Sequence, residues 1–596
     1  MRTRKAPITL GRSGPRLRAG LALILLVIGA LSCRLFWLQG FQPAAYASSA
    51  QQQRTQKVPL IAHRGSILDR NGQPLALNVD ARAVSANPKT IAAADCVPVP
   101  KTPCTAAQIA AALAPVLKLS AASLAGQLGR KDRGFVYLAR GLDPAVGKAV
   151  RALDLLGISV DTESIRIHPG GDLAANVIGF TDREGTHGLA GVELAWGKVL
   201  AGKAGTQTAQ FDGSGRMIPT GLEQIVPAVS GQDVELTLDR DLQWYAQQML
   251  TAKIAETQAV NGSVVVMDPR TGEVLAMATG PTFNPDDRSQ TSAEDLRNPA
   301  IQDAYEPGSV TKIITAAAAL EAGVVTPESV ITVPPTYNVG AHVVHDAEAH
   351  GLEHLTFTGV LAKSSNIGTV QVAQRLGADR MHDALARFGF GVRTGLGLPG
   401  ESRGQLPAAA GWSGTSIATI PIGQGVSATA IQVASVYATV ANGGVRVAPS
   451  IVKSTIDGAG HATPVAAPEQ HRVVSARVAS TLAQMLENVV TAEGTAPLAA
   501  VPGYRVAGKT GTAQRVVNGR YAAGNYTSSF VGFAPADAPR LVVAVVLQGT
   551  GANGYFGGST AGPVFKDVMS FGLNALRIAP TGTVAPRMRL DADAAS

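Results

Sequence analysis

Apolar residues cluster most strongly near the start of the chain, where residues 19–38 predict a single membrane-spanning helix. A helix of that length rises about 30 Å, the thickness of the hydrocarbon core of a bilayer. Arg34 interrupts the stretch near its end, where its side chain can reach the interface. A cleaved signal peptide and a lipoprotein modified at Cys33 are alternatives, but the stretch is longer than a typical signal core. We favour an uncleaved anchor over residues 19–38, followed by a polar juxtamembrane stalk over residues 39–56.

Beyond the stalk, the hydrophobic pattern divides the chain into two folded parts. Residues 57–228 mix short β-rich runs with helical stretches. A second part, over residues 229–578, opens with an expected strand at 233–238 and an amphipathic helix at 241–254. The closing residues, 579–596, are rich in Ala, Pro and Asp and are predicted to be a disordered tail.

Paired strands are predicted near both ends of the second part. Residues 263–267 and 273–279 are β-branched, apolar runs joined by an Asp-Pro-Arg-Thr-Gly turn, which is typical of a hairpin. Residues 528–533 and 541–548 form a second expected pair, and mainly helical patterns fill the interval. We therefore expect an α+β fold whose sheet is assembled from both ends of the domain.

The charge distribution supports the anchor rather than nucleic-acid binding. The 596 residues carry 51 Lys and Arg against 43 Asp and Glu, a net charge of +8, and a basic excess is common in nucleic-acid-binding chains. Residues 1–18, however, hold six basic residues and no acidic one, which leaves 51 − 6 = 45 basic against 43 acidic residues elsewhere. A basic flank beside a single span predicts a cytoplasmic tail over residues 1–18 and an exported remainder.

The three cysteines exclude a disulfide-rich scaffold. Cys96 and Cys104 lie eight positions apart in a Pro-rich, loop-like segment. On the predicted topology they face an oxidising compartment, where a disulfide between them is plausible. Whether the two are bridged stays open at this point.

A serine and a lysine three positions apart form the first candidate for chemistry. Ser309 and Lys312 follow Pro307-Gly308 and precede a helix-forming run, which places them on one face of a helix N-terminus. A neutral lysine there can take the hydroxyl proton, while the helix dipole favours developing negative charge. The pair alone is weak, because Ser-x-x-Lys arises by chance about once or twice in a chain of this length.

Two further motifs follow in order and change the interpretation. Ser364 and Asn366 form a Ser-x-Asn, and Lys509, Thr510 and Gly511 form a Lys-Thr-Gly followed by Thr512. The ordered trio resembles the motif set of penicillin-binding proteins and serine β-lactamases. Further matches to class B penicillin-binding proteins occur at residues 64–72, 166–170, 188–193, 212–216, 422–425 and 529–535. His168 stands where that family often has Tyr.

The resemblance implies a fold and a domain layout. It implies a β-rich, non-catalytic pedestal or dimerisation module over residues 57–228 and a penicillin-binding transpeptidase domain over residues 229–578. The latter is expected to hold an antiparallel five-stranded sheet with helices. Only 25 residues separate Leu38 from Arg64, too few for a glycosyltransferase domain.

The resemblance also implies roles for the motif residues. Ser309 would attack the penultimate D-Ala carbonyl of a stem peptide, with Lys312 as its base. Ser364 would relay a proton to the leaving amine, and Asn366 would hold the substrate amide. The substrate carboxylate would bind to Lys509 and to the segment Thr510, Gly511 and Thr512, and the backbone N–H groups of Ser309 and Thr512 would form an oxyanion hole. No cofactor or metal is implied.

A peptidoglycan D,D-transpeptidase of the division-specific FtsI type, inhibited by β-lactams, is the function implied. An elongation-specific transpeptidase and a divisome scaffold with weak catalysis are alternatives. A β-lactamase is disfavoured, since no Glu-x-x-Leu-Asn lies between the second and third motifs. The expected partners are peptidoglycan stem peptides, a polytopic SEDS-family glycosyltransferase and other divisome proteins, but no nucleic acid. The expected location is the inner membrane, with a cytoplasmic N-terminus and a periplasmic bulk.

A group of histidines and acids precedes the second motif. Four of the ten histidines fall within residues 342–354. The group comprises His342, His345, His350, His354, Asp346, Glu348 and Glu353. Its spacings fit no standard ligand pattern, so a solvated loop beside the substrate is favoured over a metal site.

Overall fold

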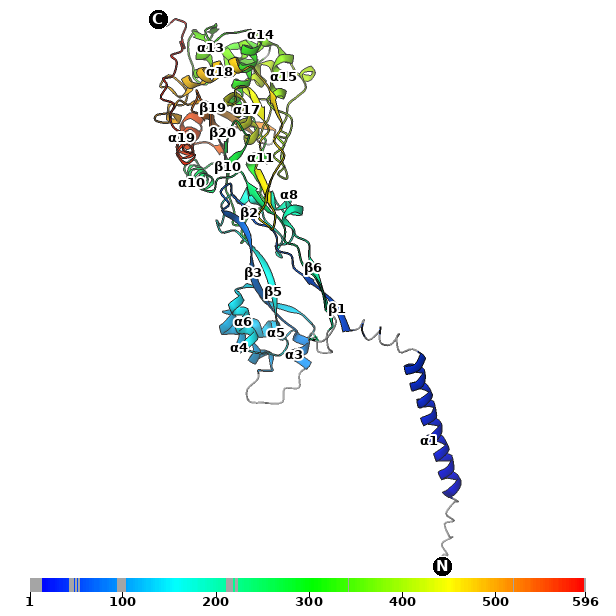
Figure 1. The fold of residues 1–596 in the computed structure, drawn as a ribbon. Helices are drawn as coiled ribbons and strands as arrows, with labels where there is room; N and C mark the ends of the chain where they lie inside the picture. The colour runs from blue at the N-terminus through cyan, green and yellow to red at the C-terminus, as the bar shows by residue number, and fades with distance from the viewer. Residues whose placement is uncertain are drawn as a thin grey trace, which may run out of the picture. The chain divides into compact units, whose positions relative to one another are not determined.

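The computed structural model describes residues 13–41, 48, 51, 54–93, 103–210, 218–219, 223–340, 342–517 and 519–593. Contacts divide the chain into two units, and Figure 1 labels their helices and strands. The first unit comprises Met1–Ala62 and Lys203–Val229, and the second comprises His63–Gly202 and Ser230–Ser596. The chain therefore returns to the first unit once before completing the second.

The first unit contains the apolar helix and a small sheet. Helix α1 (Ser13–Phe36) continues into a π-helical turn, η1 (Trp37–Phe41). Residues Gly14–Gly40 are long and apolar enough to cross a membrane, with a mean hydropathy of 2.3, which is consistent with the expected single anchor. Strands β1 (Thr55–Leu60), β6 (Gly205–Gln210) and β7 (Glu223–Val226) form an antiparallel sheet in the order β1-β6-β7.

A seven-stranded sheet forms the pedestal part of the second unit. Its strands are β2 (Ile67–Leu68), β3 (Pro74–Ala86), β4 (Val136–Leu142), β5 (Ile158–Ile167), β8 (Asp233–Leu236), β16 (Val452–Ile456) and β17 (Ala462–Pro464). The order is β17-β16-β8-β2-β3-β4, and β5 pairs with β3. The sequence pattern predicts that β8 opens the second part of the chain, residues 229–578, here called the catalytic part because the three motifs lie in it. Strand β8 instead belongs to the pedestal sheet, where it pairs with both β2 and β16.

Small helices pack against the part of this sheet that β3, β4 and β5 form. They are α3 (Pro88–Ala93), α4 (Ala106–Leu117), α5 (Ala121–Leu128) and α6 (Pro144–Ala152), which share a separate hydrophobic core with β3, β4 and β5. Cys104, just before α4, is disulfide-bonded, and its expected partner Cys96 lies outside the described residues.

Three of the segments that carry the family resemblance meet in a buried ion network within the pedestal. Glu193 is fully buried in the short helix α8 (Gly191–Ala195). Its two carboxylate oxygens accept from Arg64 Nε and Arg166 Nε, each at 2.7 Å. Arg166 also donates to the carbonyl oxygen of Gly65 at 2.8 Å. The network therefore ties together three distant segments, and a buried carboxylate is tolerated there because both oxygens are paired.

The catalytic part is built on the expected five-stranded antiparallel sheet. The strands are β9 (Asn261–Met267), β10 (Val274–Gly280), β19 (Ala507–Val517), β20 (Arg520–Ala534) and β21 (Leu541–Thr550), in the order β10-β9-β21-β20-β19. Two strands come from the start of the domain and three from its end, which confirms the predicted assembly. Strand β19, which carries the third motif, is an edge strand.

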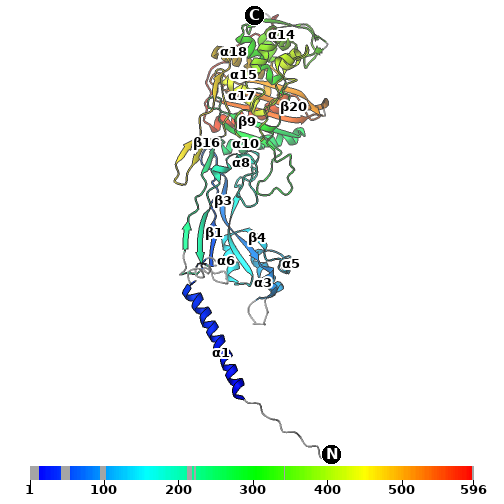
Figure 2. The ribbon, with the colours of Figure 1, turned by 90° about the vertical axis from the view of Figure 1, so that its right-hand side faces the viewer.

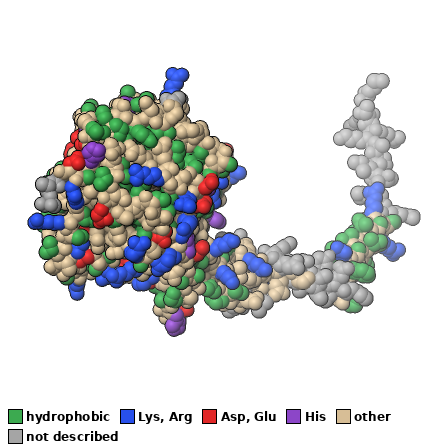
Figure 3. Space-filling view, turned by 90° about the horizontal axis from the view of Figure 1, so that it is seen from above, with side chains coloured by type: hydrophobic (Ala, Val, Ile, Leu, Met, Phe, Trp, Pro, Cys, Tyr) green, Lys and Arg blue, Asp and Glu red, His purple; other side chains and the backbone are tan. Residues whose placement is uncertain are grey.

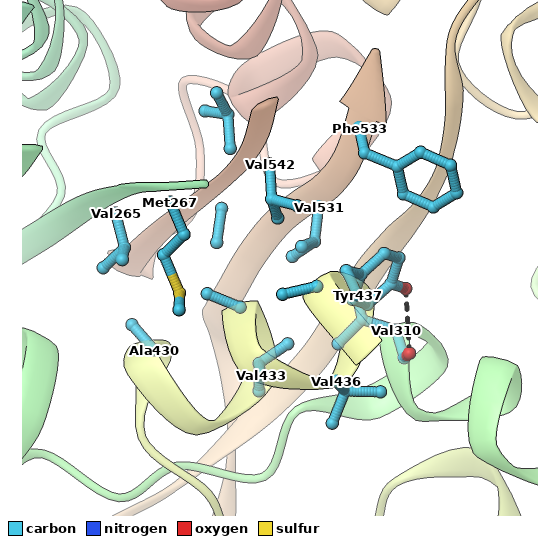
Figure 4. Packing of buried hydrophobic residues seen from close by; sticks show 14 of the residues in the cluster. Val265, Met267, Val310, Ala430, Val433, Val436, Tyr437, Val531, Phe533 and Val542 are labelled. Atoms are coloured by element: carbon cyan, nitrogen blue, oxygen red, sulfur yellow. Dashed lines mark hydrogen bonds between the residues drawn. The ribbon is translucent and has the colours of Figure 1, made fainter. Parts of the chain in front are cut away.

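Helices cover both faces of this sheet. Alternate side chains of a strand point to opposite faces. Phe530 of β20 meets Phe565 of α19 (Gly557–Ala575) edge to face at 4.6 Å, whereas Val531 and Phe533 face α17 (Ala430–Ala441) in Figure 4. Helix α10 (Arg240–Thr257) packs beside α19, so that α17 and α10 flank the sheet in Figure 2.

The buried helix α17 connects the sheet to the first motif. Thr429 begins it with a capping box to Gln432, and every residue of the helix is buried. Tyr437 donates its hydroxyl proton to the carbonyl oxygen of Val310 at 2.9 Å (Figure 4). That bond fixes the segment next to Ser309 against the core.

The remaining elements surround the motifs. They are α7 (Ala175–Ile178), α9 (Gly197–Leu200), α11 (Pro299–Gln302), η2 (Gly308–Thr311), α12 (Lys312–Glu321), β11 (Val330–Val333), β12 (Tyr337–Val339), β13 (His342–Val344), β14 (Glu353–Thr356), α13 (Phe357–Ala362), α14 (Asn366–Leu376), α15 (Ala378–Arg387), η3 (Ala409–Gly411), α16 (Ser416–Thr419), η4 (Ile420–Ile422), β15 (Val445–Val447), β18 (Gln470–Arg472), α18 (Ala476–Glu487), η5 (Asn488–Val490) and η6 (Pro497–Ala499). Acidic and basic side chains both occur across the face of Figure 3, in line with the nearly neutral charge beyond residue 18.

The C-terminal segment differs from the disordered tail expected over residues 579–596. Residues 579–593 follow the surface of the catalytic part, and Leu590 is buried, with an exposed fraction of 5%. The backbone N–H of Thr356 donates to the carbonyl oxygen of Leu590 at 2.8 Å. One apolar side chain and backbone hydrogen bonds to β14 hold a segment whose composition is otherwise typical of disorder.

Candidate active site

Ser309 lies in the 3-10 turn η2, which continues directly into α12. Gly308 before it has a φ of +61°, which favours glycine, and its N–H donates to the carbonyl oxygen of Gly423 at 3.1 Å. A Cβ on Gly308 would lie 3.1 Å from Cβ of Ala513. The close approach brings Ser309 against edge strand β19, at the helix N-terminus predicted from the sequence.

Lys312 joins the first two motifs. Its side chain is fully buried. Its Nζ donates to the carbonyl oxygen of Ser364 at 2.6 Å, to Ser364 Oγ at 3.2 Å and to Asn366 Oδ1 at 2.8 Å. Two further predicted site residues, Ser364 and Asn366, which lie 52 and 54 positions after Lys312 in the chain, therefore meet at its amino group.

The environment of Lys312 controls its charge. Burial lowers the pKa of Lys312 to about 7, while the carboxylate of Asp346 acts in the opposite direction. Burial and the charge of Lys312 also lower the pKa of Lys509. A substantial fraction of Lys312 is neutral at physiological pH, as a base for a hydroxyl requires.

The turn that presents Ser364 is held from outside the motif. Ser364 has a φ of +58°, a left-handed conformation that costs a non-glycine residue about 1 to 2 kcal/mol. Asp346 accepts the N–H groups of Asn366 at 2.5 Å and of Ile367 at 3.0 Å, and Ser365 Oγ donates to it at 2.7 Å. The carboxylate thus caps the start of α14 and fixes the turn.

Asp346 belongs to the group of histidines and acids before the second motif, for which the sequence favours a solvated loop over a metal site. Within the ranges that the structure describes, no group of three or more His, Cys, Asp and Glu side chains is placed to hold a metal ion. His350 Nε2 lies 3.2 Å from Asp346 Oδ2, and the carbonyl oxygen of His345 accepts from Asn366 Nδ2 at 2.8 Å. The loop therefore supports the Ser-x-Asn turn, a role that no local sequence pattern indicated.

The third motif lies on β19, with alternate residues on opposite faces. Lys509 is fully buried, and its Nζ donates to Thr510 Oγ1 at 3.1 Å. Thr510 Oγ1 also shares a hydrogen bond with Thr495 Oγ1 at 2.9 Å. Thr512 Oγ1 accepts the N–H of Gly557, the first residue of α19, at 3.2 Å.

Gly511 lies between these threonines on the opposite face of the strand. A Cβ at Gly511 would lie 2.3 Å from Ser529 Oγ and 3.0 Å from the carbonyl oxygen of Pro307. Only glycine therefore lets the turn containing Ser309 approach β19 this closely.

One large cleft brings the motifs together. Its volume is about 1290 Å³, and its lining includes Ser309, Ser364, Asn366, Thr510 and Thr512. The predicted residues Lys312, Lys509 and Gly511 lie behind this lining.

Aromatic side chains that the sequence reasoning did not single out form one wall of the cleft. Tyr526 and Tyr555 stack with ring centroids 4.4 Å apart, and Phe556 lies against Tyr555. The site combines a half-buried serine hydroxyl that lines the cleft, a lysine of lowered pKa and hydroxyl groups on an edge strand. This set of groups is suited to acyl transfer through a covalent serine ester, with a carboxylate bound nearby.

Comparison with known proteins gives matches to two family models. Residues 262–570 match the penicillin binding protein transpeptidase domain, and residues 59–236 match the penicillin-binding protein dimerisation domain. The end of the second match at residue 236 coincides with the end of β8, in agreement with the place of that strand in the pedestal sheet.

Curated relatives match over most of the chain. Penicillin-binding protein PbpB of Mycobacterium tuberculosis is 40% identical over 579 residues, which cover 93% of this chain and 84% of the relative. Peptidoglycan D,D-transpeptidase FtsI of Escherichia coli is 35% identical over 561 residues, which cover 94% and 91%. The crystal structure of penicillin binding protein 3 from Mycobacterium tuberculosis complexed with ampicillin superposes with a TM-score of 0.70 at 36% identity, covering 90% of this chain and 100% of that one.

Proposed function

The chain belongs to the class B penicillin-binding proteins, and from that membership we propose that it cross-links peptidoglycan at the division septum with Ser309 as its nucleophile. Its activity is that of a peptidoglycan D,D-transpeptidase, a serine enzyme that β-lactams inhibit. The observation that carries the residue assignment is the position of Lys312 Nζ, within 3.2 Å of Ser364 Oγ and 2.8 Å of Asn366 Oδ1, at the cleft that Ser309 lines.

The acylation step follows from the charge state of Lys312. Neutral Lys312 takes the hydroxyl proton of Ser309 as its oxygen attacks the penultimate D-Ala carbonyl of the donor peptide. Ser364 passes its proton to the leaving D-Ala amine and regains one from protonated Lys312, to which it is hydrogen-bonded, so that Lys312 is neutral again. Collapse of the tetrahedral intermediate breaks the peptide bond and leaves a Ser309 ester.

The donor is positioned by β19 and the start of α12. The terminal carboxylate binds to the hydroxyls of Thr510 and Thr512, with Lys509 beneath them, and Asn366 holds the substrate amide. The backbone N–H groups of Ser309 and Thr512 stabilise the oxyanion, a contribution of about 3 kcal/mol for each donor. An amine of a neighbouring stem then takes the acyl group, and Ser309 regains its proton.

The topology and partners follow from the apolar helix and the charge of the N-terminal tail. Helix α1 anchors the chain once in the inner membrane, with the basic tail over residues 1–18 in the cytoplasm and the catalytic part in the periplasm. Because no segment between the anchor and Arg64 is long enough for a glycosyltransferase domain, glycan strands must come from a separate enzyme, for which a polytopic SEDS-family partner is suited. Other divisome membrane proteins complete the assembly.

Two alternatives share these observations. An elongation-specific transpeptidase has the same motifs, and a divisome scaffold with weak catalysis would use the anchor and pedestal alone. The identity to PbpB and FtsI favours the septal role. Depletion of the protein in its own cells separates the first alternative: filaments with blocked septa are expected, whereas swollen or rounded cells would indicate elongation.

The experiment that tests the site is intact-mass and peptide analysis after incubation with a β-lactam. A single adduct on Ser309 is expected, and Ser309→Ala should abolish it, while the exposed control Ser413→Ala should label fully. An adduct on another residue would overturn the assignment. Septation supported by Ser309→Ala, with labelling lost, would favour the scaffold instead.

A further inference from the structure

Residues 579–592 form an extended segment, here named the C-terminal strap, that runs along the catalytic part toward α13 (Figure 1). Its beginning is held by hydroxyl contacts. Thr583 Oγ1 donates to Asp537 Oδ2 at 2.5 Å and accepts from Arg505 Nη1 at 2.9 Å. Just before the strap, the hydroxyl of Tyr504 donates to the carbonyl oxygen of Ile578 at 2.6 Å.

The end of the strap pairs with β14. Thr356 N–H donates to the carbonyl oxygen of Leu590 at 2.8 Å, and Ala592 N–H donates to the carbonyl oxygen of His354 at 2.7 Å. The same carbonyl of Leu590 lies 2.1 Å from where a Cβ on Gly359 would be. Gly359 is in α13, so the strap touches the helix backbone at a distance that only glycine permits.

The strap also contacts both ends of α13. At the N-terminal end, Thr356 Oγ1 accepts the N–H of Gly359 at 3.0 Å and donates its own proton to the carbonyl oxygen of Arg589 at 2.5 Å. At the other end, Lys363 Nζ lies 2.8 Å from Asp591 Oδ1. The cap of the helix and the residue that follows it are therefore both held by a segment more than 220 positions away.

Helix α13 leads straight into the Ser-x-Asn turn. Lys363 is the neighbour of Ser364, whose carbonyl oxygen accepts from Lys312 Nζ at 2.6 Å. Because Ser364 holds a left-handed backbone conformation, its position depends on how firmly the helix before it and the cap after it are fixed. Asp346 fixes the turn from the α14 side, and the strap holds it from the α13 side.

We propose that the C-terminal strap is a positioning element of the transpeptidase, which keeps Ser364 and its carbonyl in register with Lys312. The inference rests on the proposed roles of Ser364 and Lys312. It assigns a part in catalysis to residues 589–592, which touch no substrate and lie outside the matched transpeptidase domain, residues 262–570. Loss of the strap would slow acylation rather than abolish it, since the motif residues themselves remain.

The test compares the full chain with a chain that ends at Met588, and with Asp591→Asn, Asp591→Glu and the exposed control Asp593→Asn. The readouts are the second-order rate constant of acylation by a fluorescent penicillin and the melting temperature. We expect the shortened chain to be acylated about tenfold more slowly, because backbone hydrogen bonds are lost. For Asp591→Asn we expect about threefold, because its ion pair is partly exposed, while Asp591→Glu and Asp593→Asn retain the full rate.

The outcomes separate a positioning role from a structural one. An unchanged rate constant for the shortened chain, with or without a lower melting temperature, would overturn the proposal. Residual labelling of Ser309→Ala would instead overturn the proposed function, whatever the strap variants do.

Discussion

The carboxylate of Asp346 accepts the backbone N–H of Asn366 at 2.5 Å, although the two residues lie 20 positions apart. A further bond to Ile367 N–H and one from Ser365 Oγ make this carboxylate the anion that caps α14. The same carboxylate raises the pKa of Lys312 against the effect of burial. Asp346 thus influences both the geometry and the charge of the proposed base.

Replacement of Asp346 by Asn should therefore have two separable effects. The acylation rate on the high-pH plateau should fall by about tenfold, because a charged acceptor of three hydrogen bonds is lost. The ascending limb of the pH profile should move to lower pH, because the pKa of Lys312 falls when the nearby negative charge is removed. Stopped-flow acylation by a chromogenic β-lactam across pH 5 to 9 measures both.

Glu348→Gln is the matched control, since Glu348 is an exposed acid of the same loop. It should leave the plateau and the limb close to those of the unchanged protein. If Asp346→Asn lowered the plateau with no shift of the limb, the electrostatic part of the argument would fail.

The pH dependence of acylation in the unchanged protein follows from Lys312 alone. Only the neutral amine can accept the Ser309 proton, and the pKa of Lys312 is about 7. The acylation rate should rise with pH below 7 and level off above it, with half of the plateau reached near pH 7. A profile flat between pH 5 and 9, measured with a β-lactam stable over that range, would argue against Lys312 as the base.

The buried network around Glu193 predicts a stability effect without a catalytic one. Glu193→Gln removes the charge that compensates Arg64 and Arg166 and leaves buried guanidinium groups unpaired. A loss of about 3 to 5 kcal/mol in the free energy of unfolding is expected. Urea denaturation of the protein measures it, with Glu184→Gln as control, because Glu184 is the exposed partner of Arg140.

Labelling by penicillin should stay near normal in the folded fraction of Glu193→Gln. A variant with unchanged urea midpoint, or one that folds fully but fails to label, would contradict this account of the network.

Local patterns in the sequence predicted the catalytic sheet and the three motifs. The hairpin over β9 and β10 and the strands β20 and β21 are buried runs with clear turns between them, so their pairing needed little long-range information. The sequence pattern places β8 at the start of the catalytic part, whereas the structure pairs it with β2 and β16 of the pedestal sheet. These partners lie more than 160 and 210 positions away, and nothing in residues 233–236 identifies them.

The contacts that hold the site in place could not be predicted from the sequence, for the same reason. The hydrogen bonds of Asp346 form only after β13 and α14 have come together, and its neighbours suggested a solvated loop. The strap has the composition of a disordered tail, and only the pairing of Leu590 with Thr356 reveals its structure. In both cases the structure of the segment depends on one residue, Asp346 or Leu590, whose partner lies far away in the chain.

Thr495 gives the last prediction, which concerns the orientation of the Thr510 hydroxyl. A hydroxyl has one proton and two acceptor sites, and Lys509 Nζ donates to Thr510 Oγ1 at 3.1 Å. When Thr495 donates to the second site across 2.9 Å, the proton of Thr510 is left for the substrate carboxylate in the cleft. Thr495→Val should therefore weaken substrate binding by about fivefold, with kcat nearly unchanged.

Thr495→Ser keeps the hydroxyl and is the matched control, for which binding should be retained. The measurement is the separation of the apparent binding constant from the acylation rate constant over a range of β-lactam concentrations. If Thr495→Val slowed acylation at saturation and left binding intact, Thr495 would act on the chemical step and not through Thr510. Equal behaviour of the Val and Ser variants would show that the hydrogen bond between the two threonines does not orient the carboxylate site.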